Sequence, residues 1–263
     1  EIPTGWVGQF AVSSKKGFIV YAGSGGSGAF DIAALTSIVP TDVLPVYFSA
    51  AAVSASGEYV GYAEGDEMAC LYRTSDWSKI PLNAAGLSGL NAAETIAVTD
   101  DFLIIANNGL KVFSTTDGSF IPVSAPEITD NGGGICVSDT YVAVQTYSDG
   151  LNVYRVSDWS RISAAPNISG SAADMAFSPD GAYLAIVSQD IGEVAIIRTS
   201  DWSLVSLGGT VPQYCSRVVF SNDGSMLAVG SGSPAISMYN TSDWSVSAID
   251  SSNGTPTAMA LNF

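Results

Sequence analysis

The chain has 263 residues, of which 25 are acidic and nine are basic, and it contains no histidine. A net charge of −16 argues against nucleic acid and anionic membranes as partners, because both require clustered lysine or arginine. Without histidine, Ser-His-Asp and Cys-His catalysis and histidine-ligated metal sites are excluded. No apolar run is long enough to span a bilayer, so we expect a soluble chain without membrane insertion.

Short apolar runs separated by Gly, Ser, Asp and Asn are typical of an all-β protein. They recur with a period near 41 residues, and each repeat holds four predicted strands, a to d. This period predicts a single six-bladed β-propeller domain over residues 1–263, with four-stranded antiparallel blades. In chain order the predicted blades are 7–34 together with 256–263, then 51–82, 95–123, 134–164, 173–207 and 217–249.

The two chain ends are predicted to share the first blade. Residues 20–27 align without gaps on 153–160, so we assign 18–22 to strand c and 9–14 to strand b. The last residues, 257–263, resemble a strand a without a blade of its own. The ring would then close when the C-terminal strand a joins the N-terminal strands b, c and d, which removes open sheet edges.

One pentapeptide marks the predicted turn between strands c and d. Thr or Val followed by Ser-Asp-Trp-Ser occurs four times, and the first and third blades carry Gly25-Gly26 and Asp117-Gly118 instead. The aspartate can close the turn by accepting backbone N–H groups, and the tryptophan can cover the seam between blades. We therefore interpret these residues as a structural turn motif: Asp76, Trp77, Asp158, Trp159, Asp201, Trp202, Asp243 and Trp244.

The a–b and c–d turns should share one face of the ring, and the d–a and b–c loops the other. Two d–a loops, 35–47 and 83–93, are apolar and carry little charge, which suggests a contact surface. The alternative is that the first loop folds back over its own blade. The candidate interaction residues are Val39, Val43, Leu44, Tyr47, Leu87 and Leu90.

Little in the sequence indicates catalysis or a cofactor. No nucleotide-binding loop or Cys-x-x-Cys pair occurs, so we expect a protein that is not an enzyme and has no cofactor. The densest carboxylate cluster, Glu64-Gly65-Asp66-Glu67, leaves calcium open, although it lacks the oxygen spacing of a calcium loop. Arg73, Arg155 and Arg198 each precede a turn aspartate by three residues and should pair with it.

Phe177-Ser-Pro-Asp-Gly-Ala-Tyr-Leu-Ala-Ile-Val187 and Phe220-Ser-Asn-Asp-Gly-Ser-Met-Leu-Ala-Val-Gly230 resemble the WD-repeat and TolB-like β-propeller superfamily. The Asp-Trp pair is similar to the Trp-Asp of WD repeats in reverse order, but the Gly-His pair of that family is absent. The repeat style and Ser/Gly-rich, lysine-poor background also resemble propellers of tailed bacteriophage virion proteins. Both resemblances imply a propeller fold.

Fold alone does not decide function. High apolar content with few charges suggests surface covered by partners. We therefore expect a non-enzymatic structural or binding module that contacts other proteins, or further copies of itself, in a larger assembly. The resemblance implies a virion, as capsid decoration or tail component, or an extracellular surface. Two alternatives stay open: a carboxylate-based enzyme or carbohydrate binder, and an intracellular scaffold like the WD-repeat proteins.

Overall fold

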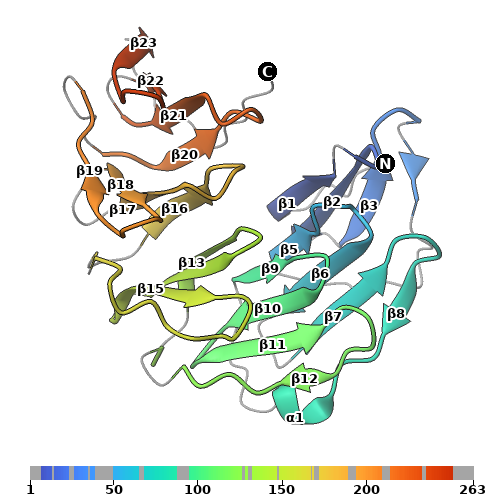
Figure 1. Cartoon of the computed structure of the whole chain (residues 1–263). Helices are drawn as coiled ribbons and strands as arrows, with labels where there is room; N and C mark the ends of the chain where they lie inside the picture. The colour runs from blue at the N-terminus through green and yellow to red at the C-terminus, as the bar shows by residue number, and fades with distance from the viewer. Residues whose placement is uncertain are drawn as a thin grey trace. The chain divides into compact units, whose positions relative to one another are not determined.

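A computed structural model gives the fold (Figure 1). It describes these residues: 7–13, 15–23, 27–34, 36–38, 50–64, 68–87, 95–125, 128–129, 132–146, 148–166, 168, 172–188, 194–208, 214–232 and 235–250. Within them the chain forms six antiparallel sheets and one four-residue helix. They belong to two compact units, 1–132 and 133–263, with three sheets in each.

The N-terminal unit contains three four-stranded sheets, and in each of them the strands follow one another in chain order. The first sheet comprises β1 (Val7–Ser13), β2 (Phe18–Gly23), β3 (Gly28–Asp31) and β4 (Thr36–Ser37). The second comprises β5 (Ala50–Val53), β6 (Tyr59–Glu64), β7 (Met68–Arg73) and β8 (Ser78–Ile80). After α1 (Ala84–Leu87), the third comprises β9 (Ile96–Val98), β10 (Phe102–Ala106), β11 (Leu110–Ser114) and β12 (Phe120–Ile121).

The C-terminal unit repeats this topology with one shortened sheet. The fourth sheet has three strands, β13 (Gly132–Val137), β14 (Tyr141–Thr146) and β15 (Gly150–Arg155). A single bridge between Tyr154 and Arg161 stands in place of its fourth strand. The fifth sheet comprises β16 (Ala172–Phe177), β17 (Tyr183–Ser188), β18 (Val194–Arg198) and β19 (Leu204–Val205), and the sixth β20 (Arg217–Phe220), β21 (Met226–Gly230), β22 (Ile236–Asn240) and β23 (Val246–Asp250).

The hydrophobic core lies between neighbouring sheets of a unit. The middle strands are apolar on both faces because each face is covered: Leu184 and Ile186 pack toward the fourth sheet, whereas Ala185 and Val187 pack toward the sixth. In the N-terminal unit, Tyr62 and Tyr72 similarly pack with the first sheet, and Leu71 packs with the third. Continuous apolar strands are therefore explained by coverage on two sides.

The first sheet differs from its prediction. One backbone hydrogen bond recurs in every sheet. The residue directly after the third strand donates its N–H to the carbonyl oxygen of the residue directly before the second strand, as Thr74 does to Glu58 at 2.9 Å. Ile32 makes the same bond to Gly17 at 2.9 Å. This bond identifies β2 as strand b and β3 as strand c, so β1 occupies the strand-a position. The assignment of 9–14 to strand b and 18–22 to strand c is therefore wrong.

The error arose because the Ser/Gly-rich residues 24–27 were aligned with the Ser-Asp-Trp-Ser turn of another repeat. Gly25-Gly26 lie between β2 and β3, and the turn between strands c and d of this sheet comes after Asp31. The Ala34 N–H donates to Asp31 Oδ1 in that turn. The predicted C-terminal strand at 256–263 lies outside the described residues.

The chain is an all-β protein, and its six antiparallel sheets fit a six-bladed β-propeller. First strands of neighbouring sheets contact one another in three cases, β1 with β5, β5 with β9, and β16 with β20. In the described part of the chain, no helix is long and apolar enough to cross a membrane.

Candidate interaction site

The Ser-Asp-Trp-Ser turns share one geometry in four sheets. In each, aspartate Oδ1 accepts the N–H of the serine two residues later, at 2.9 Å for Ser78, 3.0 Å for Ser160, 3.1 Å for Ser203 and 2.9 Å for Ser245. Each tryptophan has a left-handed backbone, with φ between 55° and 58°. Such a conformation is unfavourable for a bulky residue and persists only where surrounding contacts compensate.

The turn aspartates are held in the ionised form. Hydrogen bonds from the hydroxyl and then the backbone N–H of Ser245 lower the pKa of Asp243 below its usual value. The serine of the same motif lowers the pKa of Asp76, Asp158 and Asp201 in the same way. A carboxylate that accepts several hydrogen bonds is stabilised in its charged state, so these groups close the turn.

Aromatic contacts connect three of the tryptophans to the preceding sheet. Trp202 meets Tyr141 edge-on with ring centroids 5.0 Å apart, and Trp244 meets Tyr183 at 4.9 Å. Trp77 meets Phe18 in the same way at 6.0 Å. In each pair the partner is the first residue of strand b in the preceding sheet. The indole rings therefore cover the seams between sheets.

The third sheet has glycine at the tryptophan position. Gly118 has φ of 71°, and its N–H donates to Ser114 O at 2.9 Å, as the Trp202 N–H donates to Arg198 O at 2.8 Å. A Cβ atom on Gly118 would collide with the carbonyl oxygen of Pro81. Glycine here supplies the left-handed backbone and allows close contact with the second sheet.

Arginines pair with two of the turn aspartates. Arg155 lies 3.9 Å from Asp158, and Arg198 lies 3.3 Å from Asp201. Arg73 contributes favourable charge at Asp76. The sixth sheet has Asn240 at the arginine position. Exposed pairs of this kind contribute little to stability, but they offset the charge of Asp158 and Asp201.

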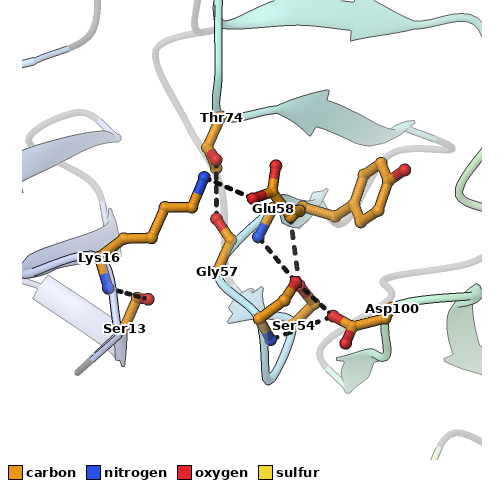
Figure 2. A network of polar contacts seen from close by, with 9 residues as sticks. Ser13, Lys16, Ser54, Gly57, Glu58, Thr74 and Asp100 are labelled. Carbon is orange, nitrogen blue, oxygen red and sulfur yellow. Dashed lines mark hydrogen bonds and ion pairs between the residues drawn. The ribbon is translucent and has the colours of Figure 1, made fainter.

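The two turns of a sheet are also bonded to one another. Thr74 Oγ1 donates to Gly57 O at 2.7 Å, which joins the c–d turn to the a–b turn (Figure 2). Thr115, Thr199 and Thr241 make the corresponding bond in three other sheets. The a–b and c–d turns of these sheets therefore share one face, as predicted.

Polar contacts on this face extend between adjacent sheets of the N-terminal unit. Lys16, from the first sheet, forms an ion pair with Glu58 of the second (Figure 2), and its Nζ lies 2.7 Å from Glu58 Oε1. Asp100 of the third sheet accepts the Ser56 N–H at 3.1 Å and also bonds the Ser56 hydroxyl. The polar groups in this network bind one another, so we interpret the network as a structural seam and not as a ligand site.

Of the predicted interaction residues, only Leu87 lies within the described residues; Val39, Val43, Leu44, Tyr47 and Leu90 lie outside them. Leu87 is half-buried and packs with Leu82 and Phe120 against the core between the second and third sheets. It also borders a hollow of about 410 Å³. The hollow is lined by Ala69, Lys79, Pro81, Leu82 and Leu87.

Asp174 on β16 is a half-buried carboxylate that sequence reasoning missed. Desolvation raises its pKa, although hydrogen bonds from backbone N–H groups and the charge of Arg217 oppose the shift. Its Oδ2 accepts the N–H of Val218 on β20 at 3.0 Å, and its Oδ1 accepts that of Met175 at 3.0 Å. The carboxylate therefore links the fifth and sixth sheets. Its only sequence signal was a charge within a predicted apolar strand.

Among the described residues no group of three or more Cys, Asp or Glu side chains could hold a metal ion. The calcium candidate falls outside this test, because Asp66, Glu67 and the side chain of Glu64 are not among the described positions.

The fold has solved counterparts. The chain is similar to the computationally designed Ika8 protein, whose crystal structure aligns with a TM-score of 0.75 at 12% identity. The alignment covers 97% of this chain and 78% of that chain. At this identity the likeness concerns the fold alone. No protein-family model matches the chain, and no curated protein matches its sequence.

Proposed function

We propose that this chain is a non-enzymatic binding module that contacts other proteins in a bacteriophage virion, as capsid decoration or tail component. Its propeller-like all-β fold supports a binding or structural domain. The composition carries the proposal: 47% of residues are hydrophobic and only 13% are charged. With so few charged residues, much of the surface is uncharged, and such a surface favours burial against partner proteins.

The described surface includes hydrophobic side chains that a partner protein would cover. Val12, Ile32, Leu204 and Tyr214 are large hydrophobic side chains that are at least 43% exposed. In the repeat turns, the aspartate side chains form hydrogen bonds within the turn itself. The resemblance of the repeat style to tailed-phage propellers favours a virion over an intracellular scaffold.

Particle fractionation tests the proposal. Cells that carry the gene would be induced to release particles, which are purified on a density gradient and analysed by quantitative mass spectrometry. We expect the chain to sediment with the particles in a fixed ratio to the major coat protein. If the chain stays at the top of the gradient while the particles are complete, the virion role is wrong.

Asp174 favours a second candidate, a carboxylate-based enzyme or sugar binder. A buried carboxylate with a raised pKa is a common feature of catalytic sites. Its bonds to Met175 and Val218 also explain it as a structural link. Native mass spectrometry distinguishes the two: a bound glycan lost in Asp174→Asn would favour the sugar binder, and an unliganded chain would favour the structural link.

A further inference from the structure

The outer edges of the sheets are not equally protected. The outer strands β4, β12 and β19 have two residues each, and β8 has three. Proline comes directly after β8 and β12, at Pro81 and Pro122. Short strands and prolines are ordinary means of preventing edge pairing. These edges offer little backbone to another strand.

The fourth sheet covers its outer edge in another way. The Ile162 N–H donates to Val153 O at 2.8 Å, and the Leu151 N–H donates to Ile168 O at 3.1 Å. The segment that contains Ile162 and Ile168 therefore occupies the outer side of β15.

The outer strand of the sixth sheet, β23, differs from these. It spans five residues and has only β22 as a strand neighbour within the described residues. Its sequence, Val-Ser-Ala-Ile-Asp, contains no lysine, proline or glycine. A register shift leaves Ser247 without a partner on β22, and a regular stretch, Ala248–Asp250, comes after it. Ser247 and Ala248 are exposed.

The turn that leads into β23 also carries a carboxylate without a neighbouring arginine. In the fourth and fifth sheets the arginine donates to the turn serine, at 2.9 Å in Arg155 to Ser160 and 3.1 Å in Arg198 to Ser203. In the sixth sheet Asn240 Nδ2 donates to Ser245 Oγ at 3.0 Å instead. The hydrogen bond is kept in this repeat, but the positive charge is missing.

Asp243 is consequently exposed and has no ion pair with any residue in the described part of the chain. The third sheet also lacks the arginine, since Ser114 takes that position before Asp117. Its outer strand is short, however, and Pro122 follows it directly. Only the sixth sheet, among those described, combines a long open edge with an unneutralised aspartate at its start.

We propose that the outer edge of β23 binds an extended segment of a partner protein that carries a basic residue beside Asp243. Main-chain hydrogen bonds to the edge would supply affinity, as in other cases of strand addition. The ion pair with Asp243 and the net charge of −16 would favour a basic segment. A second copy of the chain fits less well, because it brings the same negative charge. This inference identifies the partner chemistry of the proposed binding module and so rests on that function.

A peptide titration tests the edge. The probe is the synthetic peptide Lys-Thr-Val-Thr-Val-Lys, compared with a version in which both lysines are glutamate and with versions N-methylated on alternate residues. We expect the basic peptide to bind the full chain and slow amide hydrogen exchange of Val246–Asp250. The acidic peptide should bind more weakly. N-methylation on the edge-facing side should abolish binding, because it removes the backbone donors but keeps the charge.

Asp243→Asn should weaken binding of the basic peptide about two- to five-fold, the range expected for an exposed ion pair. The substitution keeps an oxygen that can accept the Ser245 N–H. Asp117→Asn is the matched control and should leave binding unchanged.

Three results would overturn the inference: slow exchange of β23 amides in the free chain at low concentration, concentration-dependent protection without peptide, or equal effects of the two substitutions.

Particle fractionation distinguishes a failure of this inference from a failure of the proposed virion role. A chain found in particles that fails to bind the peptide refutes the edge inference alone, whereas peptide binding by a chain absent from particles refutes the virion role alone.

Discussion

The ring of Trp244 contacts the ring of Tyr183 edge-on, with centroids 4.9 Å apart and ring planes at 78°. Trp244 lies in the turn before β23, and Tyr183 is the first residue of β17 in the preceding sheet. Trp244 is only 5% exposed although its backbone is left-handed, with φ of 58°. Packing across the seam therefore compensates for an unfavourable backbone conformation.

This relationship predicts an unusual order of stability for two substitutions. Trp244→Ala should lower the free energy of unfolding by about 3 kcal/mol or more, because it removes a buried aromatic ring. Trp244→Gly loses the same contacts but relieves the left-handed strain, so it should be about 1 kcal/mol more stable than Trp244→Ala. Urea denaturation measures both values.

Tyr183 provides the matched control, because it contacts the same ring from a strand. There the order should be the ordinary one, with Tyr183→Ala more stable than Tyr183→Gly by about 0.5–1 kcal/mol. If alanine is also the better replacement at position 244, the backbone strain is not significant.

The repeat motif could be interpreted correctly from sequence because its parts act locally. An aspartate that accepts the N–H of the serine two residues later needs no information beyond the turn. The left-handed backbone of the tryptophans was not predicted, although Gly118 at the same position was its signal. The identity of each aromatic partner depends on packing between sheets, which repeat spacing alone does not give.

Gly118→Ala should destabilise the N-terminal unit. An alanine at this position would have to adopt a left-handed backbone conformation. Its Cβ atom would also collide with the carbonyl oxygen of Pro81. We expect a loss of about 1–3 kcal/mol in unfolding free energy, measured by urea denaturation. Gly17→Ala controls for the backbone term, since Gly17 has nearly the same φ, 70°, and open space around its Cβ position. Equal losses at both positions would show that the contact with Pro81 is unimportant.

Val156→Thr should stabilise the C-terminal unit. Four other sheets carry threonine at this position, and Thr199 Oγ1 donates to Gly181 O at 2.7 Å. The corresponding acceptor in the fourth sheet is the carbonyl of Asp139, two residues before β14. A gain of about 0.5–1.5 kcal/mol is expected, with a similar loss in Thr199→Val. A destabilised Val156→Thr chain would mean that the fourth sheet does not join its turns in this way.

Lowering the pH should reduce the stability that the turn aspartates contribute, but it should not reduce the contribution of Asp174. Hydrogen bonds from Ser221, and then Ser225, lower the pKa of Asp223 to about 2. Its contribution to stability is therefore present above about pH 4, the unfolded pKa, and is lost as the pH falls toward 2. Asp174 has a raised pKa, so its protonation stabilises the folded chain as the pH falls toward 4.

Urea midpoints measured from pH 7 to pH 2 test both signs. The midpoint of Asp223→Asn should fall less than that of the wild type below pH 4, and Asp174→Asn should lack the gain above pH 4. An Asp223→Asn profile parallel to the wild type would contradict the first assignment.

The chain ends show where sequence reasoning failed. The first sheet lacks an Asp-Trp pair, so nothing in it marked which of its loops was the c–d turn. The hydrogen bond from the Ile32 N–H to the Gly17 carbonyl identifies which strands of this sheet are b and c, and repeat alignment cannot reveal it. The edge of β23, which has no outer strand partner among the described residues, was also missed. Whether an edge is paired depends on which strands are neighbours, and repeat spacing does not give this.

A double-mutant cycle on Trp244 and Tyr183 tests the central claim, that the Asp-Trp repeat is a device for joining sheets. Trp244→Ala, Tyr183→Ala and the double variant are compared by urea denaturation, with Tyr141, which contacts Trp202 instead, as the non-contacting control. We predict a coupling free energy of about 0.5–1.5 kcal/mol for the first pair and none for Trp244 with Tyr141. Additive effects at Trp244 and Tyr183 would contradict the account.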